Sequence, residues 1–170
     1  MKLKRGFFIR DVLKVAPELL GKHLVRKYED GLVERKLITE VEAYRGEEDM
    51  AAHARFGKTE RNIVMYEKGG YVYVYLIYGK YWMLNIVTGG SGHPQAVLIR
   101  GVEGITGPGR VGKWLKLNKS FYGEDLTKNN KLWLEDGVQI RSRDIKRMER
   151  VGVDYAGVWA KKKWRFFIEN

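Results

Sequence analysis

A strict alternation of residue types near position 75 constrains the fold of this chain more than any other feature. From residue 71 to residue 76, tyrosines occupy the odd positions and aliphatic residues the even positions. Successive side chains of a β-strand point to opposite faces of its sheet, so the pattern predicts a strand with one tyrosine face and one aliphatic face. The chain then turns at residues 78–81 and continues as a largely apolar run over residues 82–87. The stretch therefore predicts a β-hairpin whose tip carries aromatic side chains.

Other segments predict a mixed fold. Strand-like runs occupy residues 23–28, 32–44, 96–100 and 164–168, and the Asp30-Gly31 pair between the first two is typical of a hairpin turn. Helices are predicted over residues 16–21 with Pro17 in the first turn, 47–54, 108–117, and 143–151 with Ser142 as the N-cap. Strands outnumber helices and mostly connect through hairpins. We therefore predict a single compact α+β domain over residues 1–170, on a curved antiparallel β-sheet with a protruding hairpin and flanking helices.

The charge of the chain predicts a polyanionic partner. Its 170 residues include 32 Lys and Arg against 21 Asp and Glu, a formal net charge of +11. A domain this basic attracts nucleic acid, because each phosphate that it neutralises releases a condensed counterion. The alternative is that the charge serves solubility alone.

Several protein classes are excluded by what the sequence lacks. No apolar run approaches the roughly 18 residues that span a bilayer, and the basic N-terminus is not followed by the apolar stretch of a signal peptide. The chain has no cysteine, which excludes disulfides, thiolate metal sites and a cysteine nucleophile. We therefore expect an intracellular protein that does not bind membranes.

Two carboxylates on one predicted strand are candidates for acid–base chemistry. Glu40, Glu42 and Tyr44 are two residues apart and share a face. Paired carboxylates can exchange protons with a substrate, but glutamates on a sheet face are more often simply solvated, and strand period cannot separate these two. His53 follows nearby, and with Glu47 or Asp49 it would form a poor metal site, so we predict no bound metal.

The tyrosine face has two interpretations. Tyr71, Tyr73 and Tyr75 could be packed core aromatics, or they could stack nucleobases in a basic protein. The hairpin tip, with Tyr78 and Tyr81, could wedge between base pairs from the minor groove. The alternation alone leaves both interpretations open.

Several motifs taken together resemble one family over nearly the whole chain, from about Phe7 to Phe167. The motifs are Thr39-Glu40-Val41-Glu42-Ala43-Tyr44, Asp49-Met50-Ala51-Ala52-His53-Ala54, Arg61-Asn62, the run from Tyr73 to Tyr81, Asn85, Val97-Leu98-Ile99-Arg100, Gly107-Pro108-Gly109, Leu117-Asn118-Lys119-Ser120 and Arg150-Val151-Gly152-Val153. In this order they resemble the alkyladenine (3-methyladenine) DNA glycosylase family. Several motifs in the same order are far more specific than any one of them.

The resemblance implies a set of catalytic residues. The family's base, which deprotonates the water that attacks C1′ of the deoxyribose, corresponds to Glu42. Arg100 and the backbone carbonyl of Val151 match the groups that help to hold that water. Glu40 receives no role from the resemblance.

The resemblance also implies how a damaged base is held. The flipped base would lie between Tyr44 on one side and His53 with Tyr75 on the other. Tyr78 matches the residue that fills the gap left in the duplex. Asn85 matches the residue that obstructs the exocyclic amine of guanine.

The family implies a base-excision-repair enzyme. We expect a monofunctional hydrolase that flips damaged purines out of double-stranded DNA and leaves an abasic site, acting on alkylated adenine, hypoxanthine or etheno adducts. It would need no cofactor and act as a monomer, in the cytoplasm at the nucleoid, or in the nucleus of a eukaryote. One alternative is a bifunctional glycosylase with a lysine nucleophile, although no lysine lies in a matched catalytic motif. Another is a non-catalytic nucleic-acid-binding module that uses the tyrosine face, in which Glu42 would oppose phosphate binding.

Overall fold

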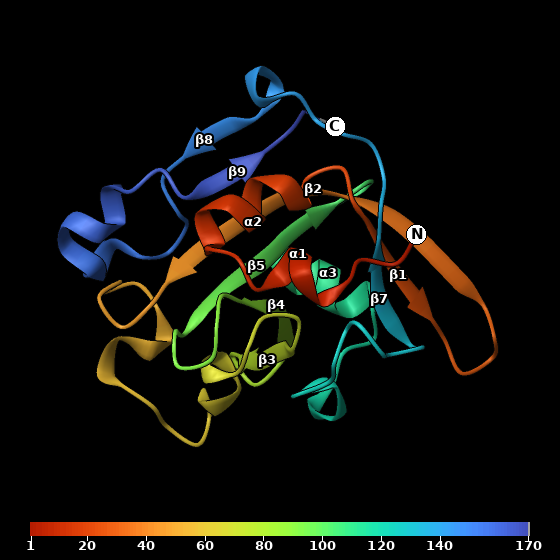
Figure 1. The fold of residues 1–170 in the computed structure, drawn as a ribbon, viewed down its shortest axis with the longest axis horizontal. Coiled ribbons are helices and arrows are strands. Elements are labelled where there is room, and N and C mark those ends of the chain that lie inside the picture. The colour runs from red at the N-terminus through yellow and green to blue at the C-terminus, as the bar shows by residue number, and fades with distance from the viewer. Residues whose placement is uncertain (170) are drawn as a thin grey trace.

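A nine-stranded antiparallel sheet organises residues 1–169, the part of the chain that this computed structural model describes (Figure 1). Its strands are β1 (His23–Lys27), β2 (Val33–Arg45), β3 (Val72–Ile77), β4 (Tyr81–Thr88), β5 (Gln95–Val102), β6 (Ile105–Thr106), β7 (Leu132–Glu135), β8 (Lys146–Met148) and β9 (Arg165–Phe167). The main path runs β3-β4-β5-β2-β1-β7; β6 pairs with β5, β9 pairs with the second half of β2, and β8 pairs with β9. This confirms the predicted α+β class and antiparallel sheet.

The long strand β2 joins two halves of the sheet. Its first half pairs with β1, and its second half lies between β5 and β9. The β2–β5 register shifts between Ile38 and Glu40 and again between Glu40 and Val41. Such irregularities bend a strand and increase its twist, which gives the sheet the curvature that the sequence predicted.

The α-helices cover one face of the sheet; they are α1 (Arg5–Phe8), α2 (Val12–Leu19) and α3 (Pro108–Trp114). The chain also forms short 3-10 segments, η1 (His53–Phe56), η2 (Ile63–Tyr66), η3 (Lys119–Phe121), η4 (Ser142–Asp144) and η5 (Asp154–Lys161), of which η1 and η2 pack against the opposite face. In Figure 1, α1 and α2 lie in front of the strands. Helix α3 packs so closely on β4 that only glycine fits at position 112, because a Cβ there would lie 1.9 Å from the carbonyl oxygen of Trp82. None of the helices within residues 1–169 is long and apolar enough to cross a membrane.

Strand alternation gives the sheet two different faces. The core face, under the helices, carries the fully buried apolar residues Val41, Ala43, Val72, Val74, Leu84, Ile86, Val97 and Ile99. The opposite face, which we call the site face, carries the intervening residues of the same strands, including Glu42, Tyr44, Tyr73, Tyr75, Asn85 and Arg100. The candidate catalytic residues are therefore on the face opposite the α-helices.

Most predicted strands are confirmed. The hairpin pairs Val72 with Ile86 and Ile77 with Tyr81, so its tip lies where the sequence predicted. The β1–β2 hairpin closes at Asp30 and Gly31, and β5, β9 and α3 lie within a few residues of their predicted ranges. The sequence did not indicate β7, which pairs with β1 over 100 residues away.

The predicted helix over residues 143–151 is wrong. The chain forms the short segment η4 and then β8, and Arg141 occupies the N-cap position that was predicted for Ser142. Pairing of β8 with β9, with Arg147 opposite Phe166, satisfies the backbone of this segment at the sheet edge. This long-range pairing overrides a local pattern that was compatible with a helix.

Two other helix predictions are shifted. Helix α2 begins at Val12, and Asp11 caps it by accepting a hydrogen bond from the Leu13 N–H at 2.8 Å. Pro17 consequently lies near the end of the helix rather than in its first turn. Residues 47–54 form turns that lead into η1 rather than a helix of their own.

Candidate active site

Glu42 is the most deeply buried acid on the site face. Its carboxylate is fully buried in β2, yet both of its oxygens are engaged. The Tyr44 hydroxyl donates to Oε1 at 3.0 Å, the Val151 N–H donates to Oε2 at 2.6 Å, and the Arg100 guanidinium lies 3.5 Å from Oε1. Three separate parts of the chain therefore hold one carboxylate in a single orientation.

The surroundings of Glu42 make it a stronger base than an exposed glutamate. Burial raises the pKa of its carboxyl, although the charge of Arg100, the Val151 N–H and the Tyr44 hydroxyl act against that rise. Burial and the neighbouring Glu42 also raise the pKa of Tyr44, so its hydroxyl stays protonated and can donate. A carboxylate with a raised pKa accepts a proton more readily.

Glu40, which the sequence left without a role, holds the cation beside Glu42. Its Oε1 accepts from Arg100 Nε at 3.2 Å and from Arg165 Nη1 at 3.3 Å. Arg100 is thus shared between the two glutamates, with Nε on Glu40 and Nη1 towards Glu42. The two carboxylates that strand period could not separate have different surroundings.

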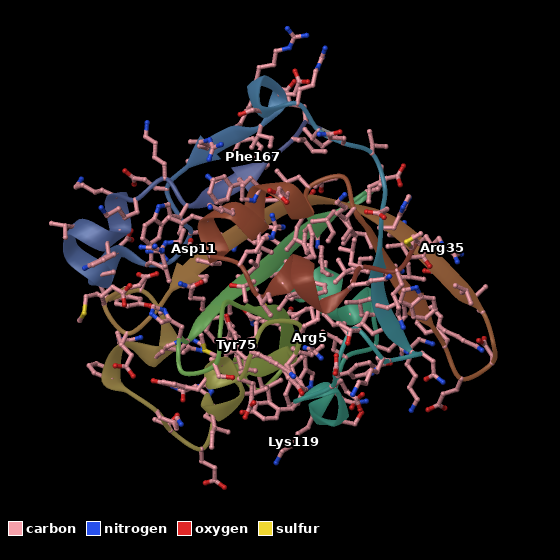
Figure 2. All side chains as sticks on the ribbon, viewed as in Figure 1. Arg5, Asp11, Arg35, Tyr75, Lys119 and Phe167 are labelled. Atoms are coloured by element: carbon pink, nitrogen blue, oxygen red, sulfur yellow. The ribbon has the colours of Figure 1, made fainter. Side chains whose placement is uncertain are left out.

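A small cavity lies against Tyr44, whose hydroxyl donates to Glu42. It is lined by Tyr44, His53, Met65, Tyr73, Tyr75, Asn85 and Ala96, and its volume is about 20 Å³. The structure thereby brings together four residues that the resemblance assigned to base binding, two on the β3–β4 hairpin, one on β2 and one on η1. Figure 2 labels Tyr75 on the β3 side of the sheet. The cavity has room for about one water molecule, so a base would enter only if the walls moved apart.

His53 forms one wall of the cavity through aromatic contacts. Its Nδ1 lies 2.9 Å from the Tyr73 hydroxyl, and its ring centroid lies 4.4 Å from that of Tyr75. Asn62, which is buried, donates to the His53 carbonyl at 3.2 Å. Burial, together with the charges of Arg61 and Arg55, lowers the pKa of His53 to about 4, so the ring is neutral at pH 7.

The tyrosine face is mostly a second core. Tyr73 is only 1% exposed and packs with Val64 and Met65, while Tyr71 lies under the guanidinium of Arg5. Tyr73 and Tyr75, but not Tyr71, also line the cavity. The face is therefore not an open platform on which successive bases could stack, as the alternative of a simple binding module requires.

Asn85 presents an unpaired donor to the cavity. The residue is 4% exposed on β4, and within residues 1–169 its Nδ2 has no hydrogen-bond partner. A buried amide without a partner costs free energy, which a ligand with a suitable acceptor can recover.

Tyr78 lies outside the cavity, at the tip of the β3–β4 hairpin. It is 92% exposed, and its φ of +54° belongs to the left-handed region that residues other than glycine rarely adopt. The turn therefore projects an aromatic ring into solvent, at a cost in both backbone strain and apolar exposure.

Val151 contacts Glu42 through its backbone N–H. The resemblance assigned its backbone carbonyl to the water and gave no role to this N–H. It also gave no role to Tyr73, Asn62 or the buried Asp49–Arg150 ion pair, all of which support this site. In the described part of the chain, no three His, Asp or Glu side chains come close enough together to hold a metal ion.

Comparison with known proteins gives one consistent family. Residues 6–106 and 103–170 match the family described as Methylpurine-DNA glycosylase (MPG). A relative from Anaeromyxobacter sp. (strain Fw109-5) is 45% identical over 179 residues, covering 100% of this chain and 90% of its own. Relatives from Methanocella arvoryzae and Legionella pneumophila (strain Corby) are 40% and 41% identical, covering 99% of this chain and 92% and 95% of their own. All three carry names that designate them provisionally as 3-methyladenine DNA glycosylases.

The depressed pKa of His53 predicts acid-sensitive folding. The unfolded chain takes up this proton near the ordinary pKa of 6.5, whereas the folded chain does so only near pH 4. His53 therefore contributes its full share to the free energy of unfolding above pH 6.5. This contribution, about 3 kcal/mol, is lost as the pH falls towards 4. We expect His53→Gln to remove this loss, measured as the free energy of unfolding in urea between pH 7 and pH 4.

Tyr73→Phe is the control for this prediction. It removes the hydroxyl that contacts His53 Nδ1 but keeps the burial that is the largest cause of the shift, so it should retain most of the acid sensitivity. Parallel stability curves for the wild type and His53→Gln would contradict the prediction.

Proposed function

Because this chain belongs to the methylpurine-DNA glycosylase family, we propose that it removes damaged purine bases from double-stranded DNA with Glu42 as the base that activates water. The observation that carries the proposal is the buried Glu42 carboxylate, held by three donors, one of which, Tyr44, also lines an aromatic cavity. A carboxylate this deeply buried in a basic protein serves no phosphate contact. It has the surroundings of a proton acceptor.

The reaction is hydrolysis of the bond between C1′ of the deoxyribose and the base nitrogen. The water oxygen bonds to C1′, the C1′–N bond breaks with its electron pair leaving on the base, and Glu42 accepts a proton from the water. Cleavage of a glycosidic bond develops positive charge on the sugar, which a nearby carboxylate stabilises. Arg100 and the backbone of Val151 would orient the water and the carboxylate. The product is an abasic site, and no cofactor takes part.

The base would be read after it leaves the duplex. Its glycosidic bond is inaccessible in the stack, so the nucleotide must be flipped, at a cost that is lower for damaged or mispaired bases. Tyr44 on one side and His53 with Tyr75 on the other would sandwich the base. Stacking of roughly 1–3 kcal/mol per base offsets part of the flipping cost. Alkylated adenine, hypoxanthine and etheno adducts are the candidate substrates.

Two further residues would set selectivity and access. Asn85 lines the cavity, so its unpaired Nδ2 would face a bound base and oppose the exocyclic amine of guanine, because two donors cannot pair. The exposed ring of Tyr78 would fill the space that the flipped nucleotide leaves in the stack. The formal charge of +11 supplies sequence-independent contacts to phosphates.

We further infer the working unit and its location. Residues 1–170 would act as one glycosylase domain and as a monomer on duplex DNA. The substrate places this activity where the genome is, in the cytoplasm at the nucleoid or, in a eukaryote, in the nucleus. Because water, rather than a lysine of the enzyme, would attack C1′, the enzyme would be monofunctional.

Replacing Glu42 tests the proposed base. Glu42→Gln should lower single-turnover excision of hypoxanthine from a duplex by roughly 100- to 10,000-fold, with binding to the same duplex largely retained. In the wild type, the excision rate should rise with pH through the raised pKa of Glu42 and then level off, because only the ionised carboxylate accepts the proton. Rates are measured by alkaline cleavage at the abasic site.

Glu40→Gln is the matched control, since it changes the same residue type on the same strand face and should retain measurable excision. Near wild-type excision by Glu42→Gln would refute Glu42 as the base. Trapping of a covalent enzyme–DNA complex with borohydride would instead support a lysine nucleophile.

The hairpin tip has its own test. Tyr78→Ala should reduce flipping, followed by the fluorescence of a base analogue beside the lesion, by more than it reduces binding to undamaged duplex. Tyr78→Phe keeps the ring and should behave as the wild type, because the wedge needs the aromatic surface and not the hydroxyl. Equal losses of flipping and of non-specific binding in Tyr78→Ala would exclude a wedge.

The proposed role of Asn85 in rejecting guanine can be tested by replacing it. Asn85→Ala should raise the excision of normal guanine relative to hypoxanthine by about tenfold, the effect of about 1.4 kcal/mol, in a panel of duplexes with one test base each. Thr88→Val is the control, because it removes another unpaired buried polar atom from β4 that does not line the cavity. An unchanged ratio in Asn85→Ala, or the same change in Thr88→Val, would count against the proposed role.

A further inference from the structure

A buried ion pair lies behind the proposed site. The side chains of Asp49 and Arg150 are both fully buried. Arg150 donates to both carboxylate oxygens of Asp49, at 2.6 Å from Nη1 and at 2.9 Å from Nη2. Neither residue received a role from the sequence or takes part in the reaction as proposed.

The pair ties together the three chain segments that carry the proposed site. Arg150 also donates to the carbonyl oxygens of Ala43 in β2 at 2.9 Å and of Trp159 in η5 at 3.1 Å. Asp49 accepts from the backbone N–H of Arg45 and of Ala51, each at 3.0 Å. The pair therefore joins the end of β2, the turn that leads to η1, and the segment between β8 and η5.

Two contacts connect the pair to the reacting groups. The Arg150 guanidinium lies over the ring of Tyr44, 4.9 Å from its centroid. Arg150 also precedes Val151, whose N–H is the donor on Glu42 Oε2 at 2.6 Å. A shift of Arg150 would therefore move the Val151 N–H and the Tyr44 ring together.

We propose that Asp49 and Arg150 are positioning residues for base excision, holding the Val151 N–H and the Tyr44 ring against Glu42 and so setting how readily Glu42 takes up a proton. This inference rests on the proposed role of Glu42. Apolar side chains of similar volume would stabilise such a buried site about as well, but only a forked donor reaches Asp49, Ala43 and Trp159 at once.

Changes to Arg150 and to Asp49 should shift the pKa of Glu42 in opposite directions. Misplacing Arg150 weakens the Val151 hydrogen bond and raises the pKa of Glu42 further, whereas removing the charge of Asp49 leaves Arg150 uncompensated and lowers it. The other charged or titratable groups around Glu42 are Tyr44 and Glu40 on β2, Tyr75 on β3, Arg100 on β5 and Arg165 on β9. None of these is changed in the experiment.

The experiment compares Arg150→Lys, which keeps the charge but loses the fork, with Asp49→Asn, which keeps the shape but loses the charge. The titration of the Glu42 carboxyl is followed by carbon-13 NMR, assigned by difference from Glu42→Gln, and single-turnover excision of hypoxanthine is measured over the same pH range. Arg150→Lys should titrate at higher pH than the wild type and lose roughly 100-fold in rate, as expected for a misplacement of about 1 Å. Asp49→Asn should titrate at lower pH.

Arg45→Lys is the matched control. Arg45 adjoins Tyr44 and forms a forked ion pair with Asp11, but its side chain is half-exposed and has no contact with Glu42. It should leave the titration of Glu42 unchanged even where it lowers thermal stability.

Unshifted titrations, or shifts in the same direction for both variants, would overturn the proposal and leave a structural ion pair. If Arg150→Lys does not fold, Asp49→Asn decides alone, because a downward shift requires the uncompensated charge. The NMR titration needs no activity, so it separates this inference from the proposed function, which would fail if the wild-type protein released no base.

Discussion

The burial of one carboxylate is the constraint on which the rest of the site face depends. Removing an ionised group from water costs several kcal/mol, and Glu42 has no cation in close bidentate contact to offset that cost. It is stabilised by a tyrosine hydroxyl, a backbone N–H and a shared guanidinium. These donors must come from elements that are fixed relative to one another, which accounts for the buried ion pair, the bulged β2 strand and the β8–β9 extension around them.

The two-faced sheet makes that arrangement possible. Because alternate residues of β2 point to opposite faces, Val41 and Ala43 anchor the strand under the helices while Glu42 and Tyr44 project from the other side. Rigid apolar packing on the core face fixes the positions of polar groups that have little stability of their own. A catalytic group on a strand with such support is held more precisely than one on a loop.

The alternation of residue types predicted the structural features that depend on residues close in sequence. It failed for segments whose structure is determined by pairing with distant strands. The hairpin from Val72 to Thr88 and the shared face of Glu42 and Tyr44 follow from period two alone. The helix predicted over residues 143–151 did not form because its backbone pairs with β9, which no local pattern indicates. The N–H of Val151 is 109 residues from Glu42, and Tyr73 is buried by a second core whose members come from η2 and β5. Periodicity could not separate Glu42 from Glu40; only the family resemblance did, and their different hydrogen bonds follow from distant residues that no local pattern indicates.

The small volume of the cavity has a consequence for how a base would be admitted. Its volume of about 20 Å³ requires that one wall move, and the two walls are anchored differently. Tyr44 lies on a central strand against the guanidinium of a buried ion pair, whose disruption would leave an uncompensated charge. His53 lies on a single 3-10 turn, where its ring shares a hydrogen bond with the Tyr73 hydroxyl and its carbonyl accepts one from Asn62, and the adjoining Phe56 is 79% exposed. Displacing the His53 wall would therefore cost less than displacing Tyr44. If the cavity takes a base as proposed, Tyr44 would stay fixed next to Glu42 and would keep the sugar in register with the carboxylate, while the opposite wall would adapt to purines of more than one shape.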